Sequence, residues 1–197
     1  MCNYGILYLK TKEDISMKNK KKDTDKQIDL ITSHIQDIMD ILEIPITESN
    51  KDTPRRIAKM YCKELFKNRN NQGLEELKNQ IKIFDSSYES TVHCSDIPFH
   101  SVCEHHWMPF FGTVSVSYTP RDGKVIGLSK IPRIVKYFSA KPQLQEKLTD
   151  EIGNFLVECL DPLYVRVDIE ATHTCVLCRG VESNGTTQTE FVFNSLT

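Results

Sequence analysis

Two short clusters of cysteine and histidine constrain this chain more than any other part of it. The first cluster places Cys103, His105 and His106 within four residues, and the second follows about seventy residues later with His173 close to Cys175. Thiolate and imidazole are the groups that zinc prefers, and a Cys-x-x-His pair can reach one ion from a single turn. The spacing therefore favours a metal site that the two clusters share.

Two other interpretations of the cysteines stay open at this point. Free cysteine often behaves as a small core hydrophobe, and that role suits three of the seven: Cys62, Cys94 and Cys159. It suits Cys103, Cys175 and Cys178 poorly, because each lies near a histidine or another cysteine among charged neighbours. The second alternative is a closed structural zinc site of the Cys3His type, in which Cys178 is a fourth ligand beside His106.

Composition excludes several classes of protein. The 197 residues carry a net charge of -2, so the chain has no overall basic field for nucleic acid. No apolar run approaches the length that spans a membrane, and the first residues lack the order of a signal peptide. Seven cysteines without a disulfide framework indicate a reducing compartment. We expect a cytoplasmic protein.

The N-terminal part of the chain predicts helices. Residues 1–23 predict a disordered tail with a small basic run, and residues 24–82 predict a helical region. One helix ends near Pro45, and Asp52 with Pro54 opens another. The apolar residues of the first helix recur at spacings of 3, 4, 3 and 4, which predicts an amphipathic stripe: Ile28, Ile31, Ile35, Ile38 and Leu42.

The period changes in the last part of the chain, residues 83–197. Strict alternation predicts strands at 113–118 and 163–173, with a further strand at 187–193. An Asp-Gly turn at Asp122 predicts that residues 125–128 return as a hairpin. Helices are expected after Ser129 and after Pro142. This order predicts an α+β domain with a largely antiparallel sheet and helices on one face.

Taken together, these segments closely resemble the GTP cyclohydrolase I family. The resemblance runs from about residue 27 to about residue 190. Its motifs occur in the family's order at residues 53–61, 103–106, 109–112, 125–130, 133, 145–149, 170–175 and 179–181.

The resemblance implies a fold, an assembly and a reaction. The fold is the tunnelling fold, or T-fold: an antiparallel four-stranded sheet with a helical pair on one face and N-terminal helices. Five subunits close their sheets into a barrel, two pentamers stack into a decamer, and the active site lies between subunits. The enzyme hydrolyses GTP at C8, releases formate and forms 7,8-dihydroneopterin triphosphate, the first step of pterin and folate-type biosynthesis.

The resemblance also implies roles for residues around the reacting atoms. Cys103, His106 and Cys175 match the family's Zn²⁺ ligands, and zinc lowers the pKa of a bound water to about 7. His105 and His173 match its proton-transfer positions, and imidazole titrates near neutrality.

The substrate contacts follow from the same resemblance. Glu146 matches the residue that binds guanine, where one carboxylate accepts from both N1–H and the N2 amine, and Gln145 lies beside it. Positions for the triphosphate are Ser129, Lys130, Arg133 and Arg179, with Arg56 and Lys59 as weaker candidates from a neighbouring subunit.

The chain departs from the family at its end. The family commonly continues past the last strand, whereas this sequence stops at Thr197, which leaves its terminal contacts in question. Two rival functions remain, a non-catalytic zinc-stabilised assembly protein and a related purine or pterin enzyme with an altered substrate. The presence of His105, His173 and Glu146 disfavours the first rival, because a closed structural site needs none of them.

Overall fold

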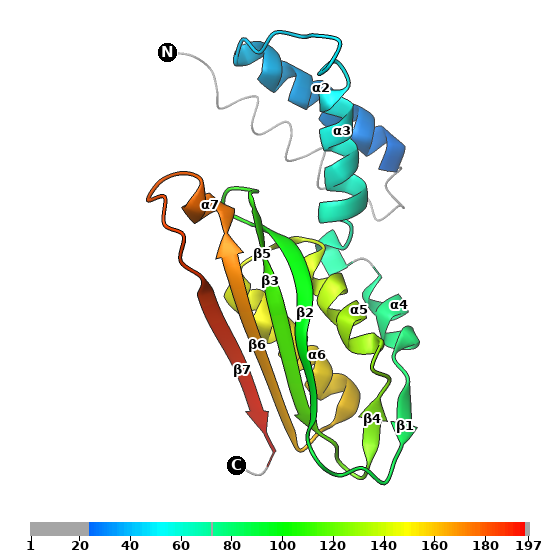
Figure 1. Cartoon of the computed structure of the whole chain (residues 1–197). Coiled ribbons are helices and arrows are strands. Elements are labelled where there is room, and N and C mark those ends of the chain that lie inside the picture. The colour runs from blue at the N-terminus through cyan, green and yellow to red at the C-terminus, as the bar shows by residue number, and fades with distance from the viewer. Residues whose placement is uncertain (1–23, 72, 196–197) are drawn as a thin grey trace, which may run out of the picture. The chain divides into compact units, whose positions relative to one another are not determined.

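The computed structural model describes residues 24–71 and 73–195 (Figure 1). The predicted disordered tail, residues 1–23, lies outside the described residues. The chain divides into two compact units, Met1–Cys62 and Lys63–Thr197. Within the part of the chain that the structure describes, no helix combines the length and apolarity needed to cross a bilayer.

The first unit is built from two helices, α2 (Thr24–Ile41) and α3 (Thr53–Met60). Pro54 occupies the first turn of α3, as predicted. Ile28 and Ala58 pack together in a small core, and Arg55 of α3 pairs with Asp29 of α2 at 2.7 Å. The predicted stripe is only partly covered within this chain, because Ile38 is 50 % exposed.

The second unit contains a five-stranded sheet in the order β5-β2-β3-β6-β7. Four of its strands pair antiparallel in the order β2-β3-β6-β7, and alternation in the sequence predicted β3, β6 and β7 but not β2. The fifth is a two-residue segment between helices α5 (Lys130–Ser139) and α6 (Gln145–Leu160), and it pairs in parallel with the end of β2. The sheet is therefore mixed and has one strand more than predicted. Its strands are β2 (Val92–Cys103), β3 (Pro109–Thr119), β5 (Pro142–Gln143), β6 (Tyr164–His173) and β7 (Thr187–Asn194).

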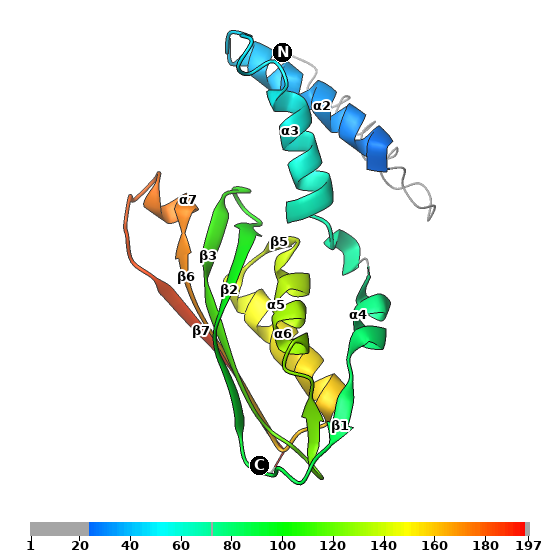
Figure 2. The ribbon, with the colours of Figure 1, turned by 45° about the vertical axis from the view of Figure 1, so that its right-hand side comes forward.

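Alternation along β6 separates an apolar face from a polar one, which confirms the α+β class. Val165, Val167 and Ile169 are at most 1 % exposed, whereas Arg166 on the opposite face pairs with Asp168 at 2.7 Å. Helices α5 (Lys130–Ser139) and α6 (Gln145–Leu160) lie against the apolar face and complete the core (Figure 2).

Gly112 allows β3 and β6 to approach closely. A Cβ atom at this position would lie 1.9 Å from the carbonyl oxygen of Glu170 on β6. No side chain can be accommodated at that separation without moving backbone. A glycine here therefore keeps the β3–β6 register, in which Gly112 pairs with Ala171.

The prediction that residues 125–128 return as a hairpin against the preceding strand is wrong. Strand β4 (Lys124–Ile126) pairs with β1 (Ile83–Asp85) in a separate two-stranded sheet. The reason is that β3 already has neighbours on both edges, β2 and β6, so no edge is free for a returning strand. Three short helical segments lie between α3 and β1 in the chain: η1 (Tyr61–Leu65), η2 (Arg69–Asn71) and α4 (Leu74–Gln80).

Candidate metal centre and active site

The structure brings the two cysteine and histidine clusters together at one end of the sheet. The ligand atoms of Cys103, His106 and Cys175 all lie within 4.8 Å of one another. Cys103 and Cys175 are buried, whereas His106 is exposed. Two sulfurs and one nitrogen this close need only small side-chain movements to meet one ion.

A tight turn presents the first two ligands. Cys103 is the last residue of β2, and its carbonyl accepts a hydrogen bond from the Trp107 N–H at 2.9 Å. The Cys103 N–H donates in turn to the Met108 carbonyl at 2.9 Å. Trp107 adopts a positive φ of 54°, and its ring meets Phe66 edge-on at 5.1 Å. The turn folds His106 back toward Cys103.

The third ligand arrives through pairing between distant strands. Phe110 at the start of β3 pairs with His173 at the end of β6. The short helix α7 (Thr174–Leu177) follows directly and carries Cys175. The Thr174 hydroxyl donates to the Pro109 carbonyl at 2.6 Å and ties this helix to β3. The register between β3 and β6 therefore decides that Cys175 meets the Cys103 turn.

The two buried thiols form a pair that suits a cation. Burial raises the pKa of the Cys175 thiol, and its hydrogen bond with Cys103 raises that pKa further. Nearby Arg179 acts in the opposite direction. Two thiolates side by side would repel each other, whereas a metal ion between them reverses that balance and holds both deprotonated. The chemistry of this donor set thus fits a metal ion.

His173 is held by its surroundings on two sides. Its ring stacks on that of Phe110, with centroids 4.6 Å apart and planes 4° apart. Its Nε2 lies 2.8 Å from Oε1 of Gln145. Burial lowers the pKa of His173, and the charge of Glu146 opposes this effect. The imidazole is therefore fixed in place next to the metal ligands and favours its neutral form.

The remaining predicted residues come from several elements of the chain. His105 is exposed in the turn, with its ring centroid 6.3 Å from that of His106. Glu146 is exposed in the first turn of α6, one residue after the buried Gln145. The other residues predicted to bind phosphate are grouped by element: Ser129, Lys130 and Arg133 at the start of α5, Arg179 after α7, and Arg56 and Lys59 in the first unit.

Cys178 lies at the C-cap of α7 and is exposed. It does not belong to the group formed by Cys103, His106 and Cys175. Among the described residues, Cys103, His106 and Cys175 could therefore hold an ion, and three protein ligands are the number found in open catalytic zinc sites.

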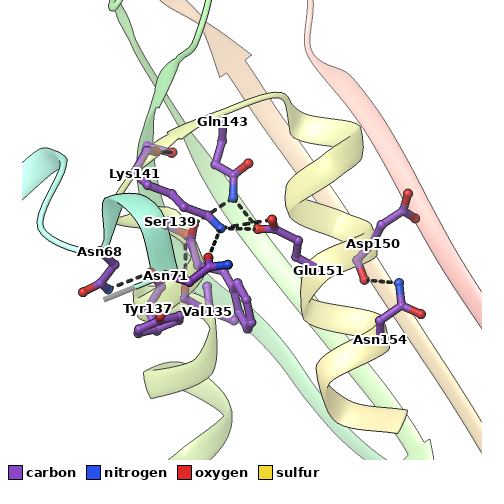
Figure 3. Close-up of polar contacts among 12 residues, drawn as sticks. Asn68, Asn71, Val135, Tyr137, Ser139, Lys141, Gln143, Asp150, Glu151 and Asn154 are labelled. Atoms are coloured by element: carbon purple, nitrogen blue, oxygen red, sulfur yellow. Dashed lines mark hydrogen bonds and ion pairs between the residues drawn. The ribbon is translucent and has the colours of Figure 1, made fainter. Parts of the chain in front are cut away.

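Lys141, Glu151, Gln143 and Asn71 form a partly buried polar network, and sequence reasoning missed it (Figure 3). The Lys141 ammonium, 7 % exposed, lies 2.9 Å from the Glu151 carboxylate and donates to Asn71 at 3.1 Å. Gln143 donates to the same carboxylate at 2.6 Å. Its backbone carbonyl accepts from the Glu104 N–H at 3.0 Å, directly after the metal ligand. In the sequence Lys141 looks like an ordinary surface lysine at a helix end, so no signal marked it.

Known proteins resemble this chain. The family model of GTP cyclohydrolase I matches residues 31–196. The chain is 44 % identical over 158 residues to GTP cyclohydrolase 1 of Bacillus pumilus, covering 80 % of this chain and 82 % of that protein. It is 46 % identical over 143 residues to GTP cyclohydrolase 1 of Bacillus subtilis, covering 73 % of each chain. A solved QueF-like archaeosine synthase is 21 % identical with a TM-score of 0.41, over 53 % of this chain and 95 % of that one.

Proposed function

The chain belongs to the GTP cyclohydrolase I family, and from that premise we propose that it hydrolyses GTP to 7,8-dihydroneopterin triphosphate and formate. The observation that carries the proposal is the grouping of Cys103, His106 and Cys175 within 4.8 Å. His173, two residues before Cys175, provides a fixed imidazole next to that group. A metal centre beside a positioned proton-transfer group is what hydrolysis of a purine ring at neutral pH requires.

The ion is Zn²⁺, held by Cys103, His106 and Cys175. Two thiolates and one imidazole are ligands that zinc prefers, and three protein ligands leave a position for chemistry. When bound, zinc supplies the Lewis acidity that activates water for attack at C8 of GTP. The burial of both thiols supports this assignment, because a charged pair of sulfurs in such a place needs a cation.

His105 and His173 transfer protons to and from the purine as its five-membered ring opens. The lowered pKa of His173 supports this role, because a neutral imidazole can accept a proton from substrate or water and return it later. His105 is exposed on the turn that carries two of the metal ligands, where substrate can reach it.

The remaining site residues bind the substrate. Glu146 accepts hydrogen bonds from N1–H and the N2 amine of guanine, and its exposed place at the start of α6 leaves the carboxylate available. The positive end of α5 favours phosphate. The triphosphate contacts are Ser129, Lys130, Arg133 and Arg179, with Arg56 and Lys59 supplied by a neighbouring subunit.

The assembly is a decamer of two pentamers with the T-fold, with active sites between subunits. The four antiparallel strands with two helices on one face support this fold. The exposed apolar residues of the first unit, including Ile38 and Leu42, support a partner for α2 in the assembly. A cytoplasmic location stays a prediction from the cysteine content.

The test is turnover of GTP by the purified, reduced protein, followed by pterin absorbance and fluorescence. Activity is measured before treatment with a chelator, after it, and after zinc is added back. Loss and zinc-dependent recovery of a pterin product support the proposal. One tightly held zinc per chain without turnover contradicts it and favours the closed structural site.

A further inference from the structure

The side chain of Gln145 is almost completely enclosed, with 2 % of the residue exposed. Its Nε2 lies 3.1 Å from the Ile169 carbonyl and 3.0 Å from the Thr187 carbonyl. Both neighbours are acceptors only, so the amide nitrogen must face them. The opposite orientation would place the amide oxygen against two carbonyl oxygens. The orientation of this amide is therefore determined by backbone of β6 and of β7.

The amide oxygen consequently faces His173. Oε1 of Gln145 lies 2.8 Å from Nε2 of His173. An amide oxygen can only accept, so the hydrogen in this bond belongs to the imidazole. In the neutral ring a proton on Nε2 leaves Nδ1 as the acceptor. The backbone of two strands thus selects one tautomer of His173 through a single glutamine.

Two threonines complete the same hydrogen-bond network in a consistent direction. The Thr149 hydroxyl donates to the backbone carbonyl of Gln145 at 2.8 Å. Its hydrogen is then used, so in the 2.7 Å contact with Thr189 it accepts and Thr189 donates. Thr189 Oγ1 lies 3.1 Å from Nε2 of Gln145, whose two hydrogens are shared among this hydroxyl oxygen and the two backbone carbonyls. Each threonine hydroxyl hydrogen therefore has a single acceptor, and neither hydroxyl donates to Oε1 of Gln145.

We propose that Gln145 is a positioning residue that holds His173 in the Nε2–H tautomer, so that Nδ1 is the ring nitrogen that exchanges protons during the reaction. The Phe110 ring fixes the plane of the imidazole, and Gln145 fixes which nitrogen carries hydrogen. The proton exchange itself rests on the proposed function, whereas the tautomer does not. This role differs from the guanine contact that the resemblance predicts for Gln145.

The tautomer is tested directly, without turnover. Solid-state ¹⁵N spectra are recorded on the zinc-loaded protein labelled in histidine, with the His173 signals identified by their loss in His173→Asn. We expect Nε2 to be protonated and Nδ1 to be bare in the unaltered protein. A proton on Nδ1 with Nε2 bare overturns the proposal, whatever the enzyme does with GTP.

The positioning role is tested with Gln145→Met, which keeps length and removes the amide. We expect loss of the single tautomer and a fall in kcat of about 10- to 100-fold, the range seen when a supporting hydrogen bond is removed from an active-site ligand. KM for GTP should change less than about 2-fold, because the interaction orients a reacting group. A raised KM with unchanged kcat overturns the proposal and assigns Gln145 to guanine.

A second pair of variants covers the case in which Gln145→Met does not fold, and it tests whether the backbone or a hydroxyl sets the amide orientation. Thr189→Val keeps the shape of the threonine and removes its hydroxyl, whereas Thr189→Ser keeps the hydroxyl. Because the carbonyls of Ile169 and Thr187 still accept from the two hydrogens of the Gln145 amide, we expect both variants to keep the Nε2–H tautomer of His173. Mixed tautomers in Thr189→Val but not in Thr189→Ser would overturn the assignment of the amide orientation to the backbone. Absence of GTP turnover in the unaltered protein counts against the proposed function alone.

Discussion

Phe110 and His173 are cross-strand partners whose rings stack almost in parallel, with centroids 4.6 Å apart and planes 4° apart. Phe110 belongs to β3, which lies between β2 and β6 in the sheet, and it is fully buried. The contact therefore connects the hydrophobic core to the edge of the active site. It places a polar ring on a rigid apolar surface, where its orientation is set by packing as well as by its hydrogen bond.

Phe110→Leu tests whether Phe110 acts by orienting the His173 ring or only by stabilising the fold. Removing the aromatic surface lets the His173 ring rotate, so we expect kcat to fall by about 10-fold while zinc stays bound. The stacked pair itself contributes about 0.5–1.5 kcal/mol. Steady-state kinetics and metal content measure the two effects. Phe155→Leu is the control, because Phe155 is also buried but packs on α5. An equal loss of kcat in both variants would show a general loss of stability only.

Cys175→Ala and Cys178→Ala should differ sharply in metal content. Cys175 lies in the ligand group and Cys178 does not. We expect the first variant to lose most of its zinc, because the site keeps only two protein ligands. The second should retain about one zinc per chain and near-normal turnover. Elemental analysis after dialysis measures the zinc content of both variants. Loss of zinc from Cys178→Ala would instead support the closed four-ligand site.

Glu151→Gln should destabilise the second unit. The change leaves the ammonium of Lys141, 7 % exposed, without its carboxylate. Breaking a buried ion pair costs on the order of 3 kcal/mol in the free energy of unfolding. Because Gln143 connects this pair to the residue after Cys103, we also expect weaker zinc binding. Urea unfolding and zinc titration measure the two effects.

The matched control for that variant lies on the same helix. Glu158→Gln removes a carboxylate that pairs with Lys78 at 2.7 Å, but the Glu158 side chain is 62 % exposed. An exposed pair contributes about 0–1 kcal/mol, so this variant should unfold at nearly the same urea concentration as the unaltered protein. Similar effects of both changes would refute a special role for the buried pair.

Glu146→Gln should weaken the binding of guanine nucleotides. The amide offers one oxygen where the carboxylate offers two, and hydrogen bonds to a charged group contribute about 1.5–3 kcal/mol. We expect the Kd for GTP to rise by about 10- to 100-fold, measured by calorimetry on the zinc-loaded protein. Asp150→Asn is the control, since Asp150 is exposed one turn later on the same helix. Unchanged affinity in Glu146→Gln would remove this residue from guanine recognition.

Local patterns predicted much of what the structure contains. Alternation marked residues 163–173 as a strand, and β6 (Tyr164–His173) confirms it. Pro54 marked the start of α3. Residue type and x-x spacing predicted a shared metal site, the family resemblance implied Cys103, His106 and Cys175 as its ligands, and the structure brings these three together. In each case the information lies within a few neighbouring residues, where the periods of helices and strands and the reach of a turn apply.

Other features depend on which distant segments meet, and the sequence did not predict them. The Asp-Gly turn predicted that residues 125–128 return against the preceding strand, but β3 had no free edge and β4 paired with β1 instead. No local pattern indicated the Lys141–Glu151 ion pair, in which the side chains are 9 % and 24 % exposed. Nothing near Gln145 indicated its contact with His173.

The sequence by itself therefore determined most of the helices and strands and the Cys and His residues that come together, because these follow from short-range spacing, and its motifs carried the resemblance to the family. Tertiary structure decided the strand pairing, the burial of the Lys141–Glu151 pair and the orientation of the Gln145 amide. That last feature depends on carbonyls of Ile169 and Thr187, on two strands distant from Gln145 in the chain. The direction of a side-chain hydrogen bond depends on which backbone groups the tertiary packing places next to it. The residues adjacent in the sequence do not predict which groups those are.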